Sequence, residues 1–186
     1  MTDLPLAAPP LTIRPMTLED VDPYLAWRNA PEVSRWLMHT RSDGATLRDE
    51  LAGEPDPNEL TLVGVLDGRV VAAGYLSVRD GMGQDLGSAH VRSEALLGWN
   101  VDPAVHRRGF GTRMAEALLA VAFDELAVHR VTAGCFADNE GSWRVMERVG
   151  MRREQHGVQD SWHAELGWVD GYTYAMLRSE WVARAG

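Results

Sequence analysis

The residues best able to do chemistry lie in one short run, His106-Arg107-Arg108-Gly109-Phe110-Gly111-Thr112. An apolar, strand-like run (95–101) comes before it, and a helical pattern (114–126) follows. Glycines let the backbone approach a ligand closely, and the first N–H groups of a helix have no partner within the helix. The helix dipole favours negative charge at that end, and arginines add bidentate donors. The run therefore predicts a phosphate site, in particular one for a pyrophosphate.

The spacing of the glycines excludes two common phosphate motifs. A P-loop requires a lysine after its second glycine, and the chain contains no lysine. A dinucleotide fingerprint requires a third glycine three residues after Gly111, where the chain has Met114. What remains is the pattern x-x-x-G-x-G between a strand and a long helix.

This pattern resembles motif A of the GNAT acyl-CoA N-acyltransferases, written Gln/Arg-x-x-Gly-x-Gly/Ala, with His106 in the first position. The segment Asn139–Met151 (NEGSWRVMERVGM) resembles motif B of the same family, in the form with serine at the fourth position. That form is typical of the ribosomal-protein N-terminal acetyltransferase branch, the RimJ/RimL type. Residues 170–181 resemble that branch's last strand and tail, and residues 11–21 the family's first strand and helix. The resemblance therefore covers nearly the whole chain.

The resemblance implies an α/β fold with a mixed, strongly twisted sheet of about six to seven strands flanked by helices. Its strands near 95–101 and 129–136 are expected to splay apart, because each leads to a helix whose N-terminus faces the same crevice. The implied cofactor is acetyl-CoA, with its pantetheine bound along the first of these strands and its pyrophosphate on the amides of the glycine turn. The residues assigned to the cofactor in this way are Trp99, Asn100, Val101, His106, Arg107, Arg108, Gly109, Phe110, Gly111, Thr112, Asn139 and Ser142.

Acyl transfer from a thioester to an amine needs a polarised carbonyl, a neutral amine and a proton for the leaving thiolate. Many GNAT enzymes supply that proton from a tyrosine on the motif B helix, where this chain has Met146. Ser142, one turn earlier, is the replacement that the serine-bearing branch implies. A serine is also common at the start of a helix for structural reasons alone, and both interpretations stay open. Asn139 is the expected N-cap of that helix.

A general base is harder to identify from the sequence. Glu94 lies on the strand before the glycine turn, on the same face as Gly98 by alternation, and is our candidate base, directly or through a water. The position where this branch usually has a glutamate holds Leu96. His90 and His163 titrate in the right range, although loop histidines often have no catalytic role.

Composition limits the class of protein. With 186 residues, 45% of them hydrophobic, the chain is expected to form one domain (1–186) whose first ten residues are loose. A net charge of −9 argues against nucleic acid as a partner. No apolar run reaches ~18 residues, and the N-terminus lacks the basic region of a signal peptide, so we expect no membrane span and a cytoplasmic location. The single cysteine, Cys135, fits a reducing compartment, and we expect no metal site.

The remaining patterns predict the elements around the site. Residues 60–66 and 69–78 form the clearest hairpin, around an Asp-Gly turn, and the loop His156–Trp168, rich in aromatics, is expected to shape the acceptor site. The other expected elements are strands at 11–15, 129–136, 151–158 and 171–178, helices starting at 18, 31 and 44, and helices at 111–127 and 139–149.

We therefore expect an acetyl-CoA-dependent N-acetyltransferase in which a primary amine attacks directly in a ternary complex. The RimJ/RimL resemblance favours an N-terminal α-amine of a protein or peptide. An aminoglycoside or polyamine acceptor stays open and is favoured if acidic residues line the acceptor cleft. A non-catalytic CoA-binding protein is the third hypothesis. We expect a monomer or a homodimer.

Overall fold

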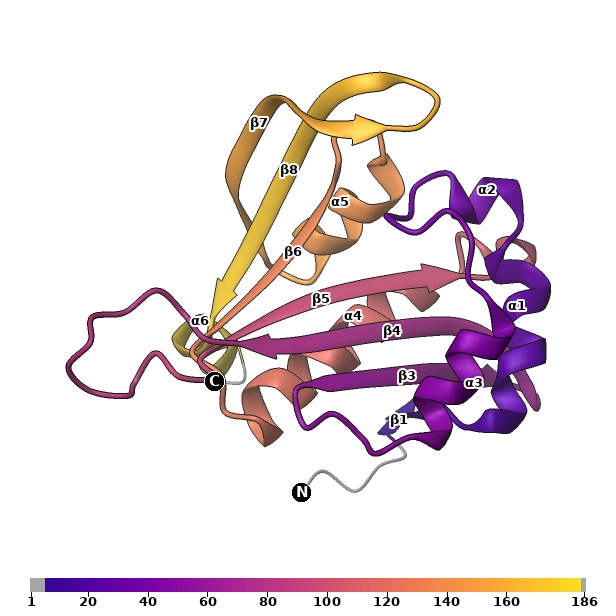
Figure 1. Cartoon of the computed structure of the whole chain (residues 1–186), viewed down its shortest axis with the longest axis horizontal. Helices are drawn as coiled ribbons and strands as arrows, with labels where there is room; N and C mark the ends of the chain where they lie inside the picture. The colour runs from indigo at the N-terminus through magenta and orange to yellow at the C-terminus, as the bar shows by residue number, and fades with distance from the viewer. Residues whose placement is uncertain (1–5, 185–186) are drawn as a thin grey trace.

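In the computed structural model, which describes residues 6–184, eight strands form one mixed sheet in the order β1-β2-β3-β4-β5-β6-β8-β7 (Figure 1). β5 and β6 pair in parallel, and the other neighbours pair antiparallel. The strands are β1 (Leu6–Ala8), β2 (Leu11–Pro15), β3 (Glu59–Leu66), β4 (Arg69–Arg79), β5 (Glu94–Val101), β6 (Arg130–Phe136), β7 (Arg152–His163) and β8 (Gly167–Leu177). The mixed α/β class is confirmed, with one strand more than expected.

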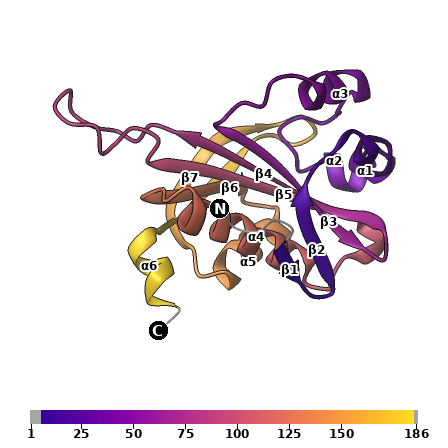
Figure 2. The ribbon, with the colours of Figure 1, turned by 90° about the horizontal axis from the view of Figure 1, so that it is seen from below.

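Helices cover both faces of this sheet (Figure 2). One face carries the larger core, where α4 and α5 pack their buried side chains against the strands and α6 joins through Trp181. The other face carries a smaller core built by α1, α2 and α3 on β3 and β4. The helical segments are η1 (Leu18–Asp20), α1 (Val21–Arg28), α2 (Pro31–Ser34), α3 (Gly44–Ala52), η2 (Pro103–Val105), α4 (Phe110–Ala120), η3 (Val121–Glu125), α5 (Glu140–Arg148) and α6 (Arg178–Ala183). Among the described residues, no helix is long and apolar enough to cross a membrane.

Local sequence explains the elements near the site. The β3–β4 hairpin turns at Asp67 and Gly68, whose φ angles of 49° and 78° suit a tight hairpin turn. The first helical segment begins with a capping box, in which Asp20 accepts a 2.8 Å hydrogen bond from the Thr17 N–H. These features confirm the predicted hairpin and the predicted start of the first helix.

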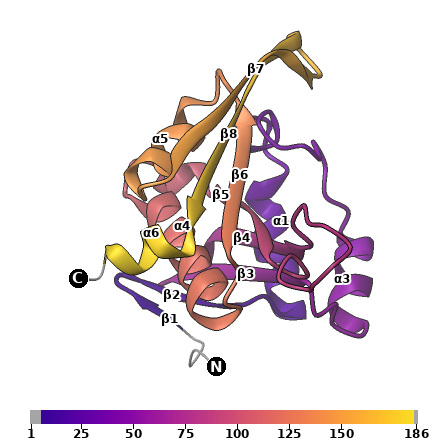
Figure 3. The same ribbon diagram turned by 90° about the vertical axis from the view of Figure 1, so that its left-hand side faces the viewer.

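The feature that matters most for function is the separation of β5 from β6. The two strands pair from Glu94–Arg130 to Leu97–Ala133, and no pair is formed beyond that point in the described residues. β5 continues along β4 to Val101, whereas β6 continues along β8 to Phe136. Figure 1 shows the two strands diverging after their shared beginning, and Figure 3 shows β6 running beside β8. The predicted splay is therefore confirmed.

Two expectations need correction. The segment expected as the loop His156–Trp168 is mostly strand, because β7 and β8 form a long hairpin that closes with the pair His163–Gly167. Nor is the whole of residues 1–10 loose, since Leu6–Ala8 pair with β2 as β1; residues 1–5 lie outside the described residues. The helix expected at 111–127 is α4 followed by the π-helical segment η3.

Candidate active site

The glycine turn has the conformation that an anion site needs. Gly109 is the N-cap of α4 and has a φ of 80°, in the left-handed region that glycine adopts most readily. A Cβ placed on Gly109 would meet nothing within 4 Å, so the backbone conformation, rather than crowding, requires glycine here. Arg107, two residues earlier, also has a positive φ of 61°. The predicted turn is therefore present.

The amides at the start of α4 point out of the helix end. The first helical hydrogen bond runs from the Arg113 N–H to the Gly109 carbonyl at 3.1 Å, so the amides of Phe110, Gly111 and Thr112 precede it. Arg107 and Arg108 are exposed at the same turn, and the Arg108 guanidinium lies 4.9 Å from the centre of the Phe110 ring. The start of α4 therefore presents several N–H donors and, beside them, two cationic side chains.

Close packing joins the start of α4 to β5. A Cβ on Gly111 would lie 3.5 Å from Val145, 3.7 Å from Val101 and 3.9 Å from Trp99, so the glycine brings helix and strand together. Trp99 and Val101 face this side of the sheet. The His106 Nε2 lies 3.0 Å from the Val101 carbonyl oxygen, so this ring connects the turn to the end of β5. The cofactor residues predicted from 99 to 112 thus form one contiguous region.

The start of α5 lies beside the diverging end of β6. The Asn139 side-chain oxygen accepts a 3.2 Å hydrogen bond from the Ser142 N–H, which confirms Asn139 as the N-cap. The half-buried Ser142 lies near Cys135, a β6 residue past the last β5–β6 pair. Burial raises the pKa of the Cys135 thiol to about 11, although Ser142 lowers it by a smaller amount, so this cysteine stays a neutral thiol rather than a nucleophile.

A small pocket lies beside the opening between the diverging ends of β5 and β6, where α1 meets β3, β4 and β5. Its volume is about 150 Å³, and it is lined by Tyr24, Leu37, Thr61, Ala73, Gly74, Tyr75, Gly98, Trp99 and Asn100. The Asn100 Nδ2 donates to the Tyr24 hydroxyl at 3.2 Å, while its Oδ1 is buried and has no hydrogen-bond partner in the described structure. The lining carries aromatic, amide and hydroxyl groups and no charged side chain.

Comparison with known proteins decides the family. The model of the acetyltransferase (GNAT) domain family matches residues 10–152. The chain belongs to the GNAT family.

Individual relatives agree with this assignment. The uncharacterized N-acetyltransferase YnaD of Bacillus subtilis (strain 168) is 36% identical over 85 residues, 46% of this chain and 49% of YnaD. The chain thus spans about half the length of that curated relative. The ribosomal-protein-S5-alanine acetyltransferase of Vibrio fischeri has a TM-score of 0.77 at 15% identity, covering 96% of this chain and 99% of that one. The aminoglycoside acetyltransferase AAC(6')-Ib, in complex with ribostamycin and coenzyme A, has a TM-score of 0.72 at 16% identity, covering 95% and 98%. At these identities the two structures show a common fold.

A GNAT domain uses acetyl-CoA as its cofactor, and the residues of this GNAT chain fit that group. The β5 edge is released from β6 after Leu97, which leaves backbone groups free for an extended pantetheine. A Cβ at Gly98 would meet nothing within 4 Å, so the face of the strand is open at this position. The helix N-terminus at Gly109 suits a pyrophosphate.

The general base expected from the sequence is not brought to the opening. Glu94 begins β5, at the paired end of the strand, and is four residues from Gly98, on the order of 13 Å along the strand. Its carboxylate forms ion pairs with Arg79 at 3.4 Å and Arg130 at 3.5 Å. This placement, with the carboxylate between two arginines at the paired end of the strand, does not favour Glu94 as the base, and its catalytic role stays a prediction.

The other two candidates for the base also lie elsewhere. His163 is buried, and both ring nitrogens are used, by the Arg35 carbonyl at 2.9 Å and by the Glu165 N–H at 3.1 Å. It fastens the β7–β8 hairpin to the segment after α2. His90 lies in the loop between β4 and β5, where its carbonyl accepts from the Gly81 N–H. The position of the family's tyrosine, Met146, is buried in the core and cannot serve as an acid.

Sequence reasoning missed the two tyrosines of the 150 Å³ pocket, Tyr24 and Tyr75. Tyr24 comes from α1 and Tyr75 from β4, more than fifty positions apart in the chain, and only the folded sheet brings them to the opening. The one signal available was the alternation of β4, which places Tyr75 on the same face as Ala73.

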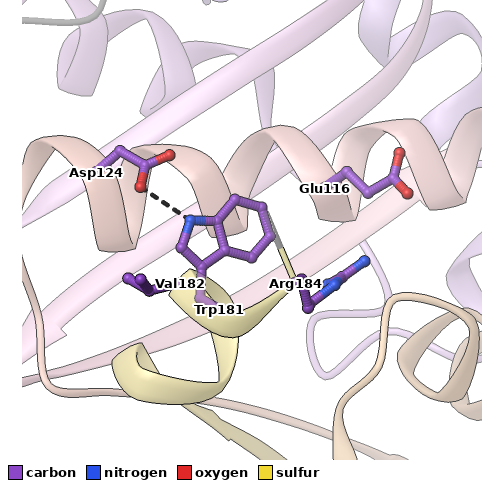
Figure 4. A pocket seen from close by; sticks show the side chains of 5 residues that line it. All are labelled: Glu116, Asp124, Trp181, Val182 and Arg184. Carbon is purple, nitrogen blue, oxygen red and sulfur yellow. Dashed lines mark hydrogen bonds between the residues drawn. The ribbon is translucent and has the colours of Figure 1, made fainter. Parts of the chain in front are cut away.

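A larger hollow, of about 450 Å³, lies between α6 and the later turns of α4 and η3 (Figure 4). Glu116, Asp124, Trp181, Val182 and Arg184 line it. The Trp181 indole N–H donates to the Asp124 carboxylate at 2.8 Å, and the ring stacks on Phe123. These contacts attach α6 to the core, away from the amides at the start of α4.

Proposed function

We propose that the protein transfers an acetyl group from acetyl-CoA to a primary amine, by direct attack in a ternary complex, and that this amine is the N-terminal α-amine of a peptide or protein. The choice of acceptor rests on one observation, the small, uncharged pocket beside the splayed strands, which we call the acceptor-side pocket. The serine form of motif B and the fold likeness to a ribosomal-protein acetyltransferase support a place in the RimJ/RimL branch.

The cofactor would be held by backbone groups at both ends of the opening. Trp99, Asn100 and Val101 would pair with the pantetheine where β6 has left the strand, and the amides at 110–112 would bind the pyrophosphate. The cofactor supplies an activated acetyl thioester, and the protein positions it. Arg107 and Arg108 would add charge-assisted contacts to the phosphates, and His106 and Asn139 hold the two loops in place.

Ser142 would donate a proton to the leaving thiolate. It lies at the start of α5 beside the diverging end of β6, near Cys135. A hydroxyl can both accept and donate a hydrogen bond, so it can donate to the thiolate of the cofactor.

The pocket favours a small, uncharged group next to the reacting nitrogen. Its 150 Å³ corresponds to about five water volumes, well below the roughly 300–1,000 Å³ of pockets that enclose drug-sized ligands. A polyamine or an aminoglycoside carries several positive charges, and the lining offers no carboxylate to pair with them. A terminal residue such as alanine matches both the size and the neutrality of the pocket.

A parallel acceptor screen tests this proposal. Release of CoA thiol would be followed with acetyl-CoA and three acceptors: a peptide with N-terminal alanine, spermidine and an aminoglycoside. We expect turnover with the peptide and little with the other two. Turnover only with spermidine or the aminoglycoside would show that the acceptor is a cationic small molecule. No release of CoA thiol with any amine would indicate a cofactor-binding protein without activity.

The proposal also covers the location and the partners of the enzyme. We propose a cytoplasmic protein, since its one cysteine, Cys135, is free. We further propose a monomer or homodimer that binds neither nucleic acid nor membranes, in keeping with its net charge of −9.

A further inference from the structure

A tyrosine, a serine and a glutamate lie together on the α1-facing side of β3 and β4. Glu59 pairs with Ser77 across the strands, and its carboxylate accepts a 2.7 Å hydrogen bond from the Ser77 hydroxyl. Tyr75 lies on the same face, diagonal to Glu59 and two residues from Ser77. Diagonal neighbours on one face of a sheet are within reach of aromatic and long side chains. Partial burial, and next the Glu59 carboxylate, raise the pKa of the Tyr75 phenol.

Tyr75 also borders the opening between β5 and β6. It is paired in register with Gly98, the first β5 residue beyond the last β5–β6 pair, and both residues line the acceptor-side pocket. Because Gly98 has no side chain, the space next to Tyr75 is open. Tyr75 is 41% exposed and lines the pocket, so a molecule entering the pocket can contact its side chain.

We propose that Tyr75 and Glu59 form a proton relay that deprotonates the acceptor ammonium. This inference rests on the proposed function and supplies the base that it lacks. An N–H bond of the ammonium breaks and its proton passes to the Tyr75 oxygen, while the Tyr75 O–H bond breaks and that proton passes to the Glu59 carboxylate. The amine is left neutral with a free lone pair, and Tyr75 ends as it began.

The surroundings of the relay suit this task. Glu59 is exposed, so it can return the proton to water after each turnover. Asp56, in the loop before β3, adds a second negative charge that favours the neutral form of Tyr75. The pocket lining itself contains no carboxylate and no imidazole, and Glu94 is held by arginines at the other end of β5. Tyr75 is thus the catalytic residue, and Glu59 acts through it.

Two conservative variants test the relay. Glu59→Gln keeps the shape and the contact with Ser77 but removes the base, and Tyr75→Phe removes the oxygen. With acetyl-CoA and the N-terminal alanine peptide at pH 7, we expect kcat/KM for the peptide to fall at least tenfold in each, with unchanged affinity for CoA. The kcat/KM of the double variant should be no lower than that of the less active single variant, because the two groups act as a unit. Glu54→Gln, which removes one exposed charge after α3, is the matched control and should keep its activity.

The pH profile separates a relay from a structural role. Above the α-amine pKa of about 8, the acceptor is neutral without help, so the deficit of both variants should shrink toward pH 9. A constant deficit from pH 7 to 9, or activities within twofold of wild type at pH 7, overturns the relay and leaves the proposed function standing. A wild-type protein that releases no thiol with any amine contradicts the proposed function, and the relay falls with it. NMR of labelled tyrosines gives a readout without turnover: the Tyr75 titration, assigned with Tyr75→Phe, should move to lower pH in Glu59→Gln, and an unchanged titration overturns the contact.

Discussion

Gly109 and Gly68 hold nearly the same backbone conformation, with φ angles of 80° and 78°, in places with different surroundings. Neither would bring a Cβ within 4 Å of another atom, so a side chain at either position causes strain through the backbone alone. Gly109 caps the helix at the proposed pyrophosphate site, whereas Gly68 turns the β3–β4 hairpin. Variants at the two glycines therefore distinguish the effect of backbone strain from a loss of cofactor binding.

We expect Gly109→Val to abolish CoA binding, because the β-branched residue forces the turn out of the left-handed region and moves the amides at 110–112. Gly68→Val should lose a similar amount of stability and keep its affinity for CoA. Calorimetric titration with CoA, together with urea unfolding of both variants, measures the two effects. Equal CoA affinity in Gly109→Val and wild type would show that the pyrophosphate binds elsewhere.

Ser142 gives a second prediction at the level of one atom. Ser142→Ala is expected to lower kcat for thiol release by about tenfold or more, in the range of general acid catalysis, with little change in CoA affinity. Ser179→Ala, an exposed serine in the first turn of α6, is the matched control. Steady-state kinetics with the alanine peptide measures both, and an unaltered kcat in Ser142→Ala would leave Ser142 a helix-start residue only.

Among the elements, the sequence predicts those whose patterns are local. The β3–β4 hairpin, the glycine turn and α5 follow from neighbouring residues, and the divergence of β5 and β6 follows from the order of strands and helices. The sequence predicts strands at 151–158 and 171–178, but not their extension into the long β7–β8 hairpin, because β7 is an edge strand with two irregularities in its register and its apolar residues do not alternate. The sequence does not predict the acceptor-side pocket, for another reason: its lining comes from α1, the segment after α2, β3, β4 and β5, which only tertiary packing brings together.

Glu154 forms ion pairs with two arginines in the β6–β8 part of the sheet, and these pairs give a pH prediction. Glu154 on β7 accepts hydrogen bonds from Arg130 on β6 at 2.5 and 3.0 Å, and one from Arg152 at 2.6 Å. Arg130 chiefly, and Arg152, lower the pKa of Glu154 from 4.5 to about 2. The charged carboxylate therefore stabilises the fold above pH 4.5, and this contribution is lost as the pH falls toward 2.

Glu154→Gln should therefore reduce the free energy of unfolding at pH 7 by about 1 kcal/mol, the upper end for partly exposed pairs. The difference from wild type should narrow as the pH falls from 5 to 3, which urea unfolding at several pH values can follow. Glu140→Gln, which breaks the exposed pair with Arg144 on α5, should change stability by only a few tenths of a kcal/mol. A Glu154→Gln difference that stays constant from pH 7 to 3 would contradict the assigned role.

At the scale of the whole molecule, the net charge of −9 acts on acceptors before they reach the pocket. A peptide with N-terminal alanine and lysines further along should show a higher kcat/KM at low salt than its uncharged counterpart. This advantage should decline as salt rises, because the Debye length falls from about 10 Å at 0.1 M to about 3 Å at 1 M. Parallel salt curves for the two peptides would show that long-range attraction plays no part.

The divergence of β5 and β6 also leaves only a short line of backbone pairing between the two parts of the sheet. Strands β1 to β5 and strands β6 to β8 meet along a seam of four residue pairs, from Glu94–Arg130 to Leu97–Ala133. Because only these four pairs join the two parts of the sheet, their amides are expected to exchange by local opening at a lower free energy than global unfolding. A molecule bound along β5 and against the start of α5 bridges both parts. Binding of such a molecule should therefore slow amide hydrogen exchange at the four β5–β6 pairs. The exchange rate there would report cofactor binding at residues that the cofactor does not contact.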